Sequence, residues 1–292
     1  MSMDLILRNA TTEQLGLAVQ ENLFALFRAM TALPNSYLEE TQYLSRHLTF
    51  PTNPMYKGAW NTGLPAEDTE EYIRETIDWF KSREAPFFFW WTGPNTSPDD
   101  LARRLLAHGL VDLEGQSTDM APGIKSSEIG APGMAADLYK MNEEVLENVP
   151  PGFEMNDVQN ETDLQDFKRV LIEGYEMPPL MANGWVQSAH EFGIGKTPWR
   201  LVLGRWNGQP VATNIVLNGG GVVGLYGIAV IPAARGKGIG AAMTLRPIVE
   251  ERDQRGYHYA ALFATLMGAF VYARIGFQLV ETRIHRYLWR NG

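Results

Sequence analysis

Three glycines stand at alternate positions in the second half of the chain, with basic residues between them. Residues 228–241 read Ile228-Ala229-Val230-Ile231-Pro232-Ala233-Ala234-Arg235-Gly236-Lys237-Gly238-Ile239-Gly240-Ala241. A glycine lets a ligand approach the backbone closely because it has no Cβ. The first amides of a helix lack partners within the helix and lie at the positive end of its dipole. A helix that begins in this segment would therefore offer a pyrophosphate site, to which Arg235 and Lys237 add positive charge.

Two common phosphate-binding motifs do not account for this segment. A Walker A loop needs Ser or Thr directly after its lysine, but Lys237 is followed by Gly238. The dinucleotide fingerprint G-x-G-x-x-A fits the spacing of Gly236, Gly238 and Ala241. That fingerprint begins directly after a strand, whereas five residues separate Val230 from Gly236. The strands predicted before the segment are also joined by hairpins rather than by parallel crossovers, so both motifs are rejected.

A third phosphate-binding motif fits better. Val230-x-Pro232 precedes Arg235-x-x-Gly238-x-Gly240, and residues 265–277 read Thr-Leu-Met-Gly-Ala-Phe-Val-Tyr-Ala-Arg-Ile-Gly-Phe. The first pattern resembles the coenzyme A loop of the GNAT superfamily of acyl-CoA-dependent N-acetyltransferases. The second resembles that family's N-x-x-A-x-x-L-Y-x-x-x-G-F ending. The resemblance covers about residues 152–289. The chain departs from it at residue 265, where the family frequently has Asn, and at residue 268, where it has Ala.

The resemblance implies that acetyl-CoA is the co-substrate, and it assigns the residues that would hold it. The amides of Ile228, Ala229 and Val230 are expected to pair with the pantetheine arm, as a neighbouring strand would. The pyrophosphate loop is expected to comprise Arg235, Gly236, Lys237, Gly238, Ile239, Gly240 and Ala241. Thr265 completes the expected coenzyme-binding set.

The catalytic assignment also follows from the resemblance. Tyr272 occupies the position of the family's tyrosine, which implies a general acid that protonates the departing coenzyme A thiolate. The alternative interpretation is a ring that only packs in the core. Strand Val222–Val230 has no carboxylate, where many relatives have one, so we assign no general base. The acids and histidine in the segment expected to flank the acceptor are interpreted as exposed helix residues: Glu173, Glu176, His190 and Glu191. The nearby aromatic residues form either an acceptor cage or core: Tyr175, Trp185, Phe192, Trp199 and Tyr226.

Composition excludes several classes of protein. The chain has 292 residues, no cysteine and a net charge of −9, with 22 acids and 11 bases in residues 1–150. The lack of cysteine excludes disulfides, thiolate metal sites and a cysteine nucleophile. No two of the five histidines are four residues apart, so we predict no metal site. The acidic charge argues against a nucleic-acid partner, and no apolar run is long enough for a membrane span. The first residues do not resemble a signal peptide, so a cytoplasmic location is expected.

Periodicity and breakers predict two α/β domains. In the second half the expected order is strand, two helices, three hairpin-linked strands, helix, strand, helix and strand. The first half repeats the last part of this order, with helices over 66–83 and 97–108 and strands over 86–91 and 110–120. Pro150-Pro151-Gly152 marks the boundary. We therefore predict tandem GNAT folds, each a mixed, mostly antiparallel sheet flanked by helices. Residues 1–150 form a degenerate domain without a coenzyme A loop, and 151–292 form the N-acetyltransferase domain.

These features support an enzyme as the first hypothesis. It would move an acetyl group from acetyl-CoA directly to a primary amine of a small molecule or protein. A non-catalytic acyl-CoA-binding or scaffold protein is the alternative, and the missing carboxylate on strand Val222–Val230 keeps it open. Aminoacyl transfer from charged tRNA also uses tandem GNAT folds, but the acidic first half and the lack of a basic stripe count against it.

Overall fold

The chain forms two compact units. The computed structural model describes residues 5–49, 57–113, 132–264 and 266–291. The first unit comprises Met1–Ala25 and Pro132–Glu281, and the second comprises Leu26–Ala131 and Thr282–Gly292. The predicted boundary after residue 150 does not coincide with this division, because each unit takes in chain from both halves of the sequence.

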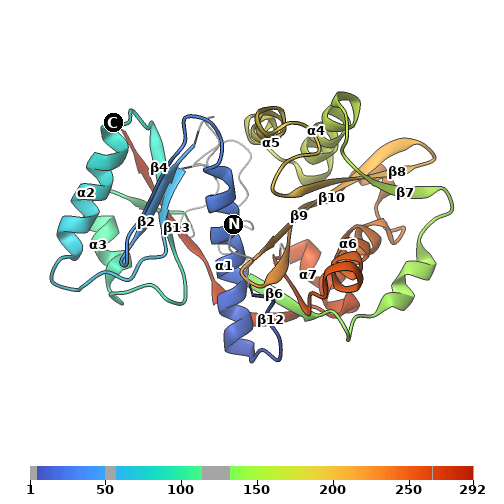
Figure 1. Ribbon diagram of the computed structural model, residues 1–292, viewed down its shortest axis with the longest axis horizontal. Helices are drawn as coiled ribbons and strands as arrows, with labels where there is room; N and C mark the ends of the chain where they lie inside the picture. Colours follow the sequence, from blue (N-terminus) through green and yellow to red (C-terminus); the bar gives the residue numbers. More distant parts are fainter. Residues whose placement is uncertain (1–4, 50–56, 114–131, 265, 292) are drawn as a thin grey trace. The chain divides into compact units, whose positions relative to one another are not determined.

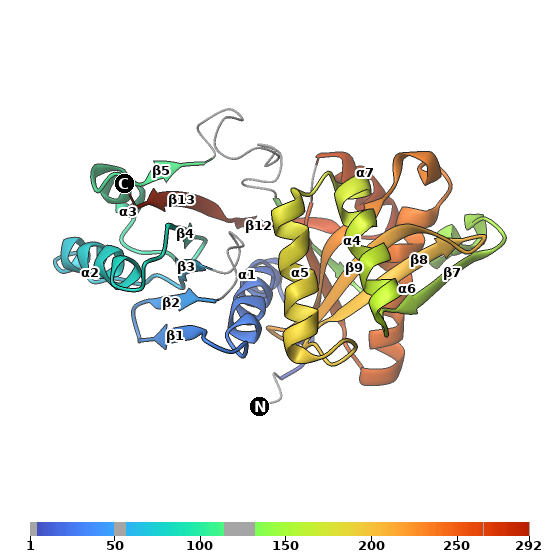
Figure 2. The same cartoon turned by 90° about the horizontal axis from the view of Figure 1, so that it is seen from above.

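The first unit is built on a seven-stranded sheet with strand order β12-β6-β11-β10-β9-β8-β7. The strands are β6 (Pro132–Asp137), β7 (Phe153–Asp157), β8 (Arg200–Trp206), β9 (Gln209–Gly219), β10 (Val222–Val230), β11 (Tyr259–Phe263) and β12 (Gln278–Arg283). Strands β7 to β10 pair antiparallel in sequence order, while β10 and β11 run parallel. The helices are α4 (Glu161–Tyr175), α5 (Pro179–Phe192), α6 (Ile239–Arg255) and α7 (Leu266–Ile275). Helices α4 and α5 lie side by side on one face of the sheet, and α6 covers the other (Figures 1 and 2).

Local sequence signals account for most elements of the first unit. The turn between β8 and β9 places Asn207 at φ 49° and Gly208 at φ 77°, as an Asn-Gly hairpin requires. Helix α4 begins at Glu161, directly after its cap Asn160. The Asn160 Oδ1 accepts from the Asp163 amide at 3.0 Å, a favourable arrangement because asparagine is among the preferred capping residues.

The two sheets are each completed by a strand from the other half of the sequence. Strand β6 pairs antiparallel with β11 in the first unit. The last strand, β13 (His285–Arg290), lies between β4 (Phe87–Thr92) and β5 (Val111–Asp112) in the second unit. Residues 132–150 therefore belong with the first unit, and the chain end belongs with the second. The interstrand hydrogen bonds explain why the predicted boundary does not match the compact units.

The second unit repeats the central arrangement of the first on a smaller scale. Its sheet has the order β1-β2-β3-β4-β13-β5. The remaining elements are β1 (Tyr37–Glu40), β2 (Ser45–Leu48), β3 (Lys57–Trp60), α2 (Thr69–Lys81) and α3 (Leu101–Ala107). Strands β3 and β4 are parallel and joined through α2, as β10 and β11 are joined through α6. The predicted strand over 110–120 is observed only at β5, and residues 114–131 lie outside the described part of the chain.

Helix α1 (Thr12–Met30) has no counterpart among the elements predicted above, and its residues up to Ala25 belong to the first unit, where they contact β9 and β10. The buried Asn22 side chain donates to the carbonyls of Leu217 (3.1 Å) and Gly219 (2.8 Å) and accepts from the Tyr226 hydroxyl (2.6 Å). A Cβ on Gly224 would overlap the Asn22 side chain. The glycines on this hairpin are thus required both by its turn and by the close approach of α1.

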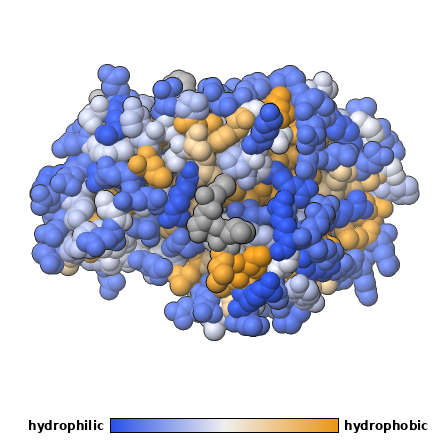
Figure 3. Space-filling model, viewed as in Figure 1, coloured by the Kyte–Doolittle hydropathy of each residue, from blue (hydrophilic) through white to orange (hydrophobic). Residues whose placement is uncertain are grey.

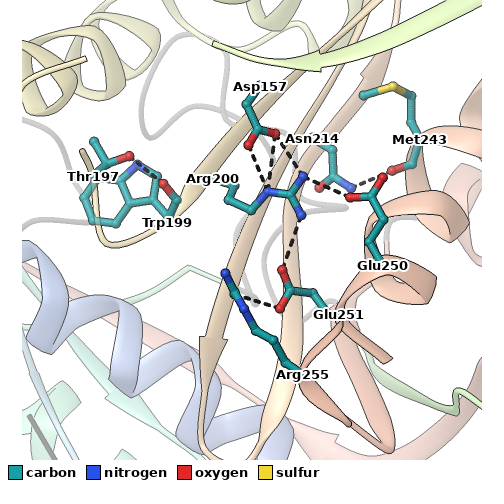
Figure 4. Close-up of polar contacts among 9 residues, drawn as sticks. All are labelled: Asp157, Thr197, Trp199, Arg200, Asn214, Met243, Glu250, Glu251 and Arg255. Atoms are coloured by element: carbon teal, nitrogen blue, oxygen red, sulfur yellow. Dashed lines mark hydrogen bonds and ion pairs between the residues drawn. The ribbon is translucent and has the colours of Figure 1, made fainter. Parts of the chain in front are cut away.

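Helix α6 contains Pro247 and continues through it. A proline has no amide hydrogen, so the carbonyl four residues earlier, that of Met243, loses its helical partner. The buried Asn214 on β9 supplies the missing donor, with Nδ2 at 2.6 Å from that carbonyl oxygen (Figure 4). A proline inside a helix commonly kinks it, but α6 runs without a break from Ile239 to Arg255, and its free carbonyl is satisfied by the sheet.

An ion-pair cluster fixes the other end of α6 to the sheet. Arg200 on β8 donates to Asp157 on β7 and to Glu250 and Glu251 on α6, at 3.0–3.3 Å (Figure 4). Glu251 is buried and also accepts from Arg255 at 2.8 Å. A buried carboxylate is tolerated when several donors surround it. The cluster holds α6 in place, far along the helix from its glycine-rich start.

We expect Asn214 and Pro247 to be energetically coupled. Replacing Asn214 with Leu leaves the Met243 carbonyl without a donor, which should lower the free energy of unfolding by about 1–3 kcal/mol. In a Pro247→Ala background the alanine amide can serve that carbonyl, so the same substitution should cost less. Urea unfolding of the wild type, both single variants and the double variant measures the coupling. Additive effects within about 0.5 kcal/mol would contradict the assigned bond.

Candidate functional site

The central strands of the first unit separate where β10 carries a β-bulge. Paired register between β10 and β11 runs only from Val223 to Leu225. One residue later the pairing of β10 with β9 shifts register, between Tyr226 and Ala229. Gly227 lies in the bulge at φ 56°, and its carbonyl accepts from the Thr213 hydroxyl at 2.9 Å. The sequence signal for this bulge is a glycine inside an otherwise apolar strand.

The backbone of Ile228, Ala229 and Val230 therefore has strand partners on one side only. Ala229 and Val230 remain in register with Thr213 and Ala212 of β9. On the β11 side, no paired register continues past Leu225 among the described residues. Such a one-sided strand can accept an extended, hydrogen-bonding ligand in place of the missing strand.

The glycine-rich segment leads from this strand into α6. Gly236 has φ 74° and Gly238 has φ 77°, and Gly238 is the residue before the helix. A Cβ on Gly236 would meet no atom within 4 Å, whereas one on Gly238 would lie 2.9 Å from the Asn148 carbonyl oxygen. No side chain caps the start of α6. Its first amides, from Ile239 onward, are thus available to an anion, as the sequence predicts.

The two basic side chains of the loop are engaged with the protein. Arg235 donates from Nε to the Val230 carbonyl and from Nη2 to the Gly174 carbonyl, both at 3.0 Å. The Lys237 ammonium lies 5.2 Å from the centre of the Trp206 ring. The expectation that both would simply add positive charge is therefore incomplete, because Arg235 holds two backbone segments together.

Tyr272 lies on α7, next to the hydrophobic core of the first unit. Its half-buried ring packs against that core, with the Phe277 ring centre 6.0 Å away. Burial raises the pKa of the Tyr272 hydroxyl above its ordinary value, so the group keeps its proton at neutral pH. A general acid has to be protonated in this way, although packing in the core accounts for the ring as well. Thr265, the other predicted site residue near α7, lies outside the described residues.

The structure does not gather the acids and histidine of α4 and α5 into one site: Glu173, Glu176, His190 and Glu191. His190 pairs with Glu161 at 2.7 Å, at the start of α4. Gly174, whose carbonyl accepts from Arg235 of the glycine-rich loop, is 13 residues further along α4, about 20 Å at 1.5 Å per residue. Glu173 and Glu176 lie beside Gly174 and are exposed, and the structure brings neither forward as a general base.

The aromatic residues do not form a cage around an open site. Trp185 and Trp199 are buried, and their rings meet edge to face at 5.5 Å. Phe192 packs on Trp199 at 5.6 Å, and the Tyr226 hydroxyl is bound to Asn22. Trp185 and Trp199 therefore belong to the core, as the second interpretation predicts, whereas Phe192 and Tyr226 are only partly buried. Tyr175, the fifth, lies in the last turn of α4.

In the second unit, the segments that follow the two central parallel strands stay joined by backbone hydrogen bonds, unlike their counterparts in the first unit. After the parallel pairing of β3 with β4, the chain continues to bond across the two segments: the Ser97 amide donates to the Thr62 carbonyl at 3.0 Å and the Leu64 amide to the Ser97 carbonyl at 3.1 Å. Helix α2 also begins with Glu70 and Glu71, whose charges would repel a pyrophosphate. Within residues 57–113, the second unit therefore shows neither the separated strands nor a helix start suited to an anion.

Comparison with known proteins establishes the fold. No family model and no curated protein matches the sequence. A GCN5-related N-acetyltransferase from Kribbella flavida superposes with a TM-score of 0.66 at 16% identity, over 95% of this chain and 96% of its own. A second GCN5-related N-acetyltransferase, from Sphaerobacter thermophilus, superposes with a TM-score of 0.55 at 14% identity, over 99% of this chain and 96% of its own. A tandem GNAT protein from the clavulanic acid biosynthesis pathway superposes with a TM-score of 0.59 at 14% identity, over 96% of this chain and 94% of its own.

This chain has the tandem GNAT fold. The likeness extends over nearly the whole chain, so the tandem GNAT fold predicted from the sequence is confirmed. None of the described helices is both long and apolar enough to cross a membrane. The described residues contain no group of three or more His, Asp or Glu side chains placed to hold a metal. The face shown in Figure 3 is mostly hydrophilic, with scattered apolar side chains.

Proposed function

We propose that the protein is an N-acetyltransferase that moves an acetyl group from acetyl-CoA to a primary amine of a small molecule or protein. One observation carries the proposal: the strand with one unpaired side, β10, leads through two positive-φ glycines into an uncapped helix start. A pantetheine arm fits the first of these features and a pyrophosphate fits the second. We further propose a cytoplasmic enzyme that needs no metal, nucleic acid or membrane partner.

Each step of the reaction can then be assigned to a particular group. Bound acetyl-CoA supplies the thioester whose carbonyl the amine attacks. The N–C bond of the product amide forms as the C–S bond breaks, and the sulfur leaves with the electron pair. Tyr272 would give its proton to that sulfur, since its hydroxyl is protonated at neutral pH. Because β10 has no carboxylate, we propose that water takes the proton of the attacking amine.

The alternative is a non-catalytic acyl-CoA-binding or scaffold protein. The lack of a carboxylate on β10 favours it, because no side chain there can deprotonate the acceptor. Isothermal titration with acetyl-CoA, together with an amine library assayed for free coenzyme A, separates the two. One binding site per chain with coenzyme A release supports the enzyme. Binding without release for any amine supports the alternative, and the lack of binding contradicts both.

We expect Gly240→Glu to abolish acetyl-CoA binding while the chain stays folded. Gly240 is in the first turn of α6, and a Cβ there meets only Val230 Cγ2 at an ordinary 3.7 Å. A carboxylate at a helix start stabilises the helix, but it would repel the pyrophosphate. The measurement is calorimetric affinity together with the thermal unfolding midpoint.

Gly240→Ala is the matched control for this substitution. It should bind acetyl-CoA as the wild type does, because only the backbone amide is needed, and it should be about 0.5–1 kcal/mol more stable. If Gly240→Glu binds acetyl-CoA with wild-type affinity, the coenzyme does not lie at the start of α6.

A further inference from the structure

Arg235 connects three segments of backbone that lie at the same end of the first unit. Its own backbone belongs to the glycine-rich loop before α6. Its side chain reaches the last residue of β10 and the last turn of α4, through the Val230 and Gly174 carbonyls. A planar guanidinium can donate in two fixed directions at once, which suits a bridge between two carbonyl oxygens.

The end of α4 is shaped to receive this bridge. The Gly174 carbonyl is among the last four of the helix, which have no partner within the helix. A Cβ on Gly174 would lie 2.9 Å from the Val230 carbonyl carbon, so only glycine lets α4 come this close to β10. Beyond it the chain turns at Glu176, which adopts φ 56°. The Glu176 and Met177 amides both donate to the Leu171 carbonyl.

The charge of Arg235 is also placed where it stabilises the protein. The C-terminal end of a helix carries partial negative charge from its free carbonyls, and a cation there is favourable. The guanidinium is therefore partly neutralised by α4 and uses two of its donors on backbone oxygens. Its contribution to an anion at the start of α6 is correspondingly reduced.

We propose that Arg235 is a positioning residue that fixes the end of α4 to the coenzyme loop. It acts through the backbone bonds at Val230 and Gly174 and not through contact with phosphate. Acetyl-CoA binding at the loop is then coupled to the conformational order of the C-terminal end of α4, which leads into α5. The proposal rests on the proposed acetyl-CoA site for its functional part. The bridge itself is a property of the ligand-free chain.

The test compares Arg235→Lys with Arg235→Ala. A lysine keeps the charge but cannot bridge two carbonyls with the same planar geometry. If the bridge matters, both variants should bind acetyl-CoA about 10- to 100-fold more weakly than the wild type, since each loses charged hydrogen bonds. If charge matters, Arg235→Lys should retain wild-type affinity and only Arg235→Ala should lose it. That result would overturn the proposal.

Hydrogen exchange of the ligand-free proteins gives a second readout. The Glu176 and Met177 amides should exchange about tenfold faster in both Arg235 variants, because local opening at the end of α4 becomes easier. Unchanged exchange there would also overturn the proposal. Arg169→Lys is the matched control: Arg169 is on the same helix and reaches the Pro210 carbonyl at 3.4 Å, but among the described contacts it bonds neither Val230 nor Gly174. It should change neither exchange at Met177 nor affinity.

A third comparison separates position from charge within the loop. Lys237→Met removes a cation that stands two residues from Arg235 and makes no backbone bridge among the described contacts. Its effect on acetyl-CoA affinity should shrink as salt is raised, because screening weakens a purely electrostatic contribution. The effect of Arg235→Lys should persist in high salt. If the wild type fails to bind acetyl-CoA at all, the proposed function is wrong, while the exchange data still decide whether the bridge exists.

Discussion

Removal of residues 282–292 is expected to unfold the second unit and leave the first unit folded. Strand β13 lies between β4 and β5, so its loss breaks hydrogen bonding on both sides. It also removes the buried side chains Tyr287, Leu288 and Trp289. At about 1.5–3 kcal/mol for each large apolar side chain, this loss is comparable with the whole stability of a domain.

Hydrogen exchange followed by mass spectrometry can locate the effect. Amides of β2 and β4 should lose protection, whereas those of β10 and α6 should keep it. Removing only residues 291–292 is the control, since it deletes one backbone bond, from the Asn291 amide to the Pro86 carbonyl. A division at residue 150 makes the opposite prediction, namely loss of protection in β10 and β11. That pattern would contradict the placement of β13 in the sheet of the second unit.

Tyr272→Phe is expected to lower kcat by about 10²- to 10⁴-fold, the contribution typical of a positioned general acid. Acetyl-CoA affinity should stay nearly unchanged, because the ring still packs against Phe277. If the proposed activity holds, the wild-type protein should not lose it through this group at pH 8–9. Its pKa is raised in the folded protein, so the proton is lost only above the range of an ordinary tyrosine.

A control separates this role from packing. Tyr139→Phe removes a hydroxyl from an exposed tyrosine of the first unit and should leave kcat as it is. The comparison needs conditions in which chemistry, rather than product release, limits turnover. Undiminished turnover of Tyr272→Phe under those conditions assigns Tyr272 to the core alone.

Short-range patterns accounted for the parts of the site that lie within one segment. The alternation of Gly236, Gly238 and Gly240 indicated a helix start, and α6 begins there at Ile239 without a side-chain cap, while anion binding stays a prediction. Asn207-Gly208 indicated a tight hairpin, and both residues adopt the required positive φ. These features depend on local backbone geometry, which neighbouring residues determine.

The remaining features depend on contacts between distant segments, and no local pattern specifies them. Whether a strand such as β13 joins the sheet nearest in sequence or another one is decided by the edges that are available. No pattern around Asn22 sets it apart in the sequence, yet it satisfies groups on β9 and β10 some 200 residues later. The direction of the Arg235 side chain depends in the same way on Gly174, which precedes it by 61 positions.

The late position of β13 has a consequence for synthesis on the ribosome. Translation at about 5–20 residues per second puts roughly 10–30 s between the end of Leu26–Ala131 and the appearance of the strand that completes its sheet. Until then the facing edges of β4 and β5 have no partner, and unpaired edges invite association with other chains. The N-terminal part of the protein therefore cannot finish folding first, and nascent chains depend on being kept apart until the last residues emerge.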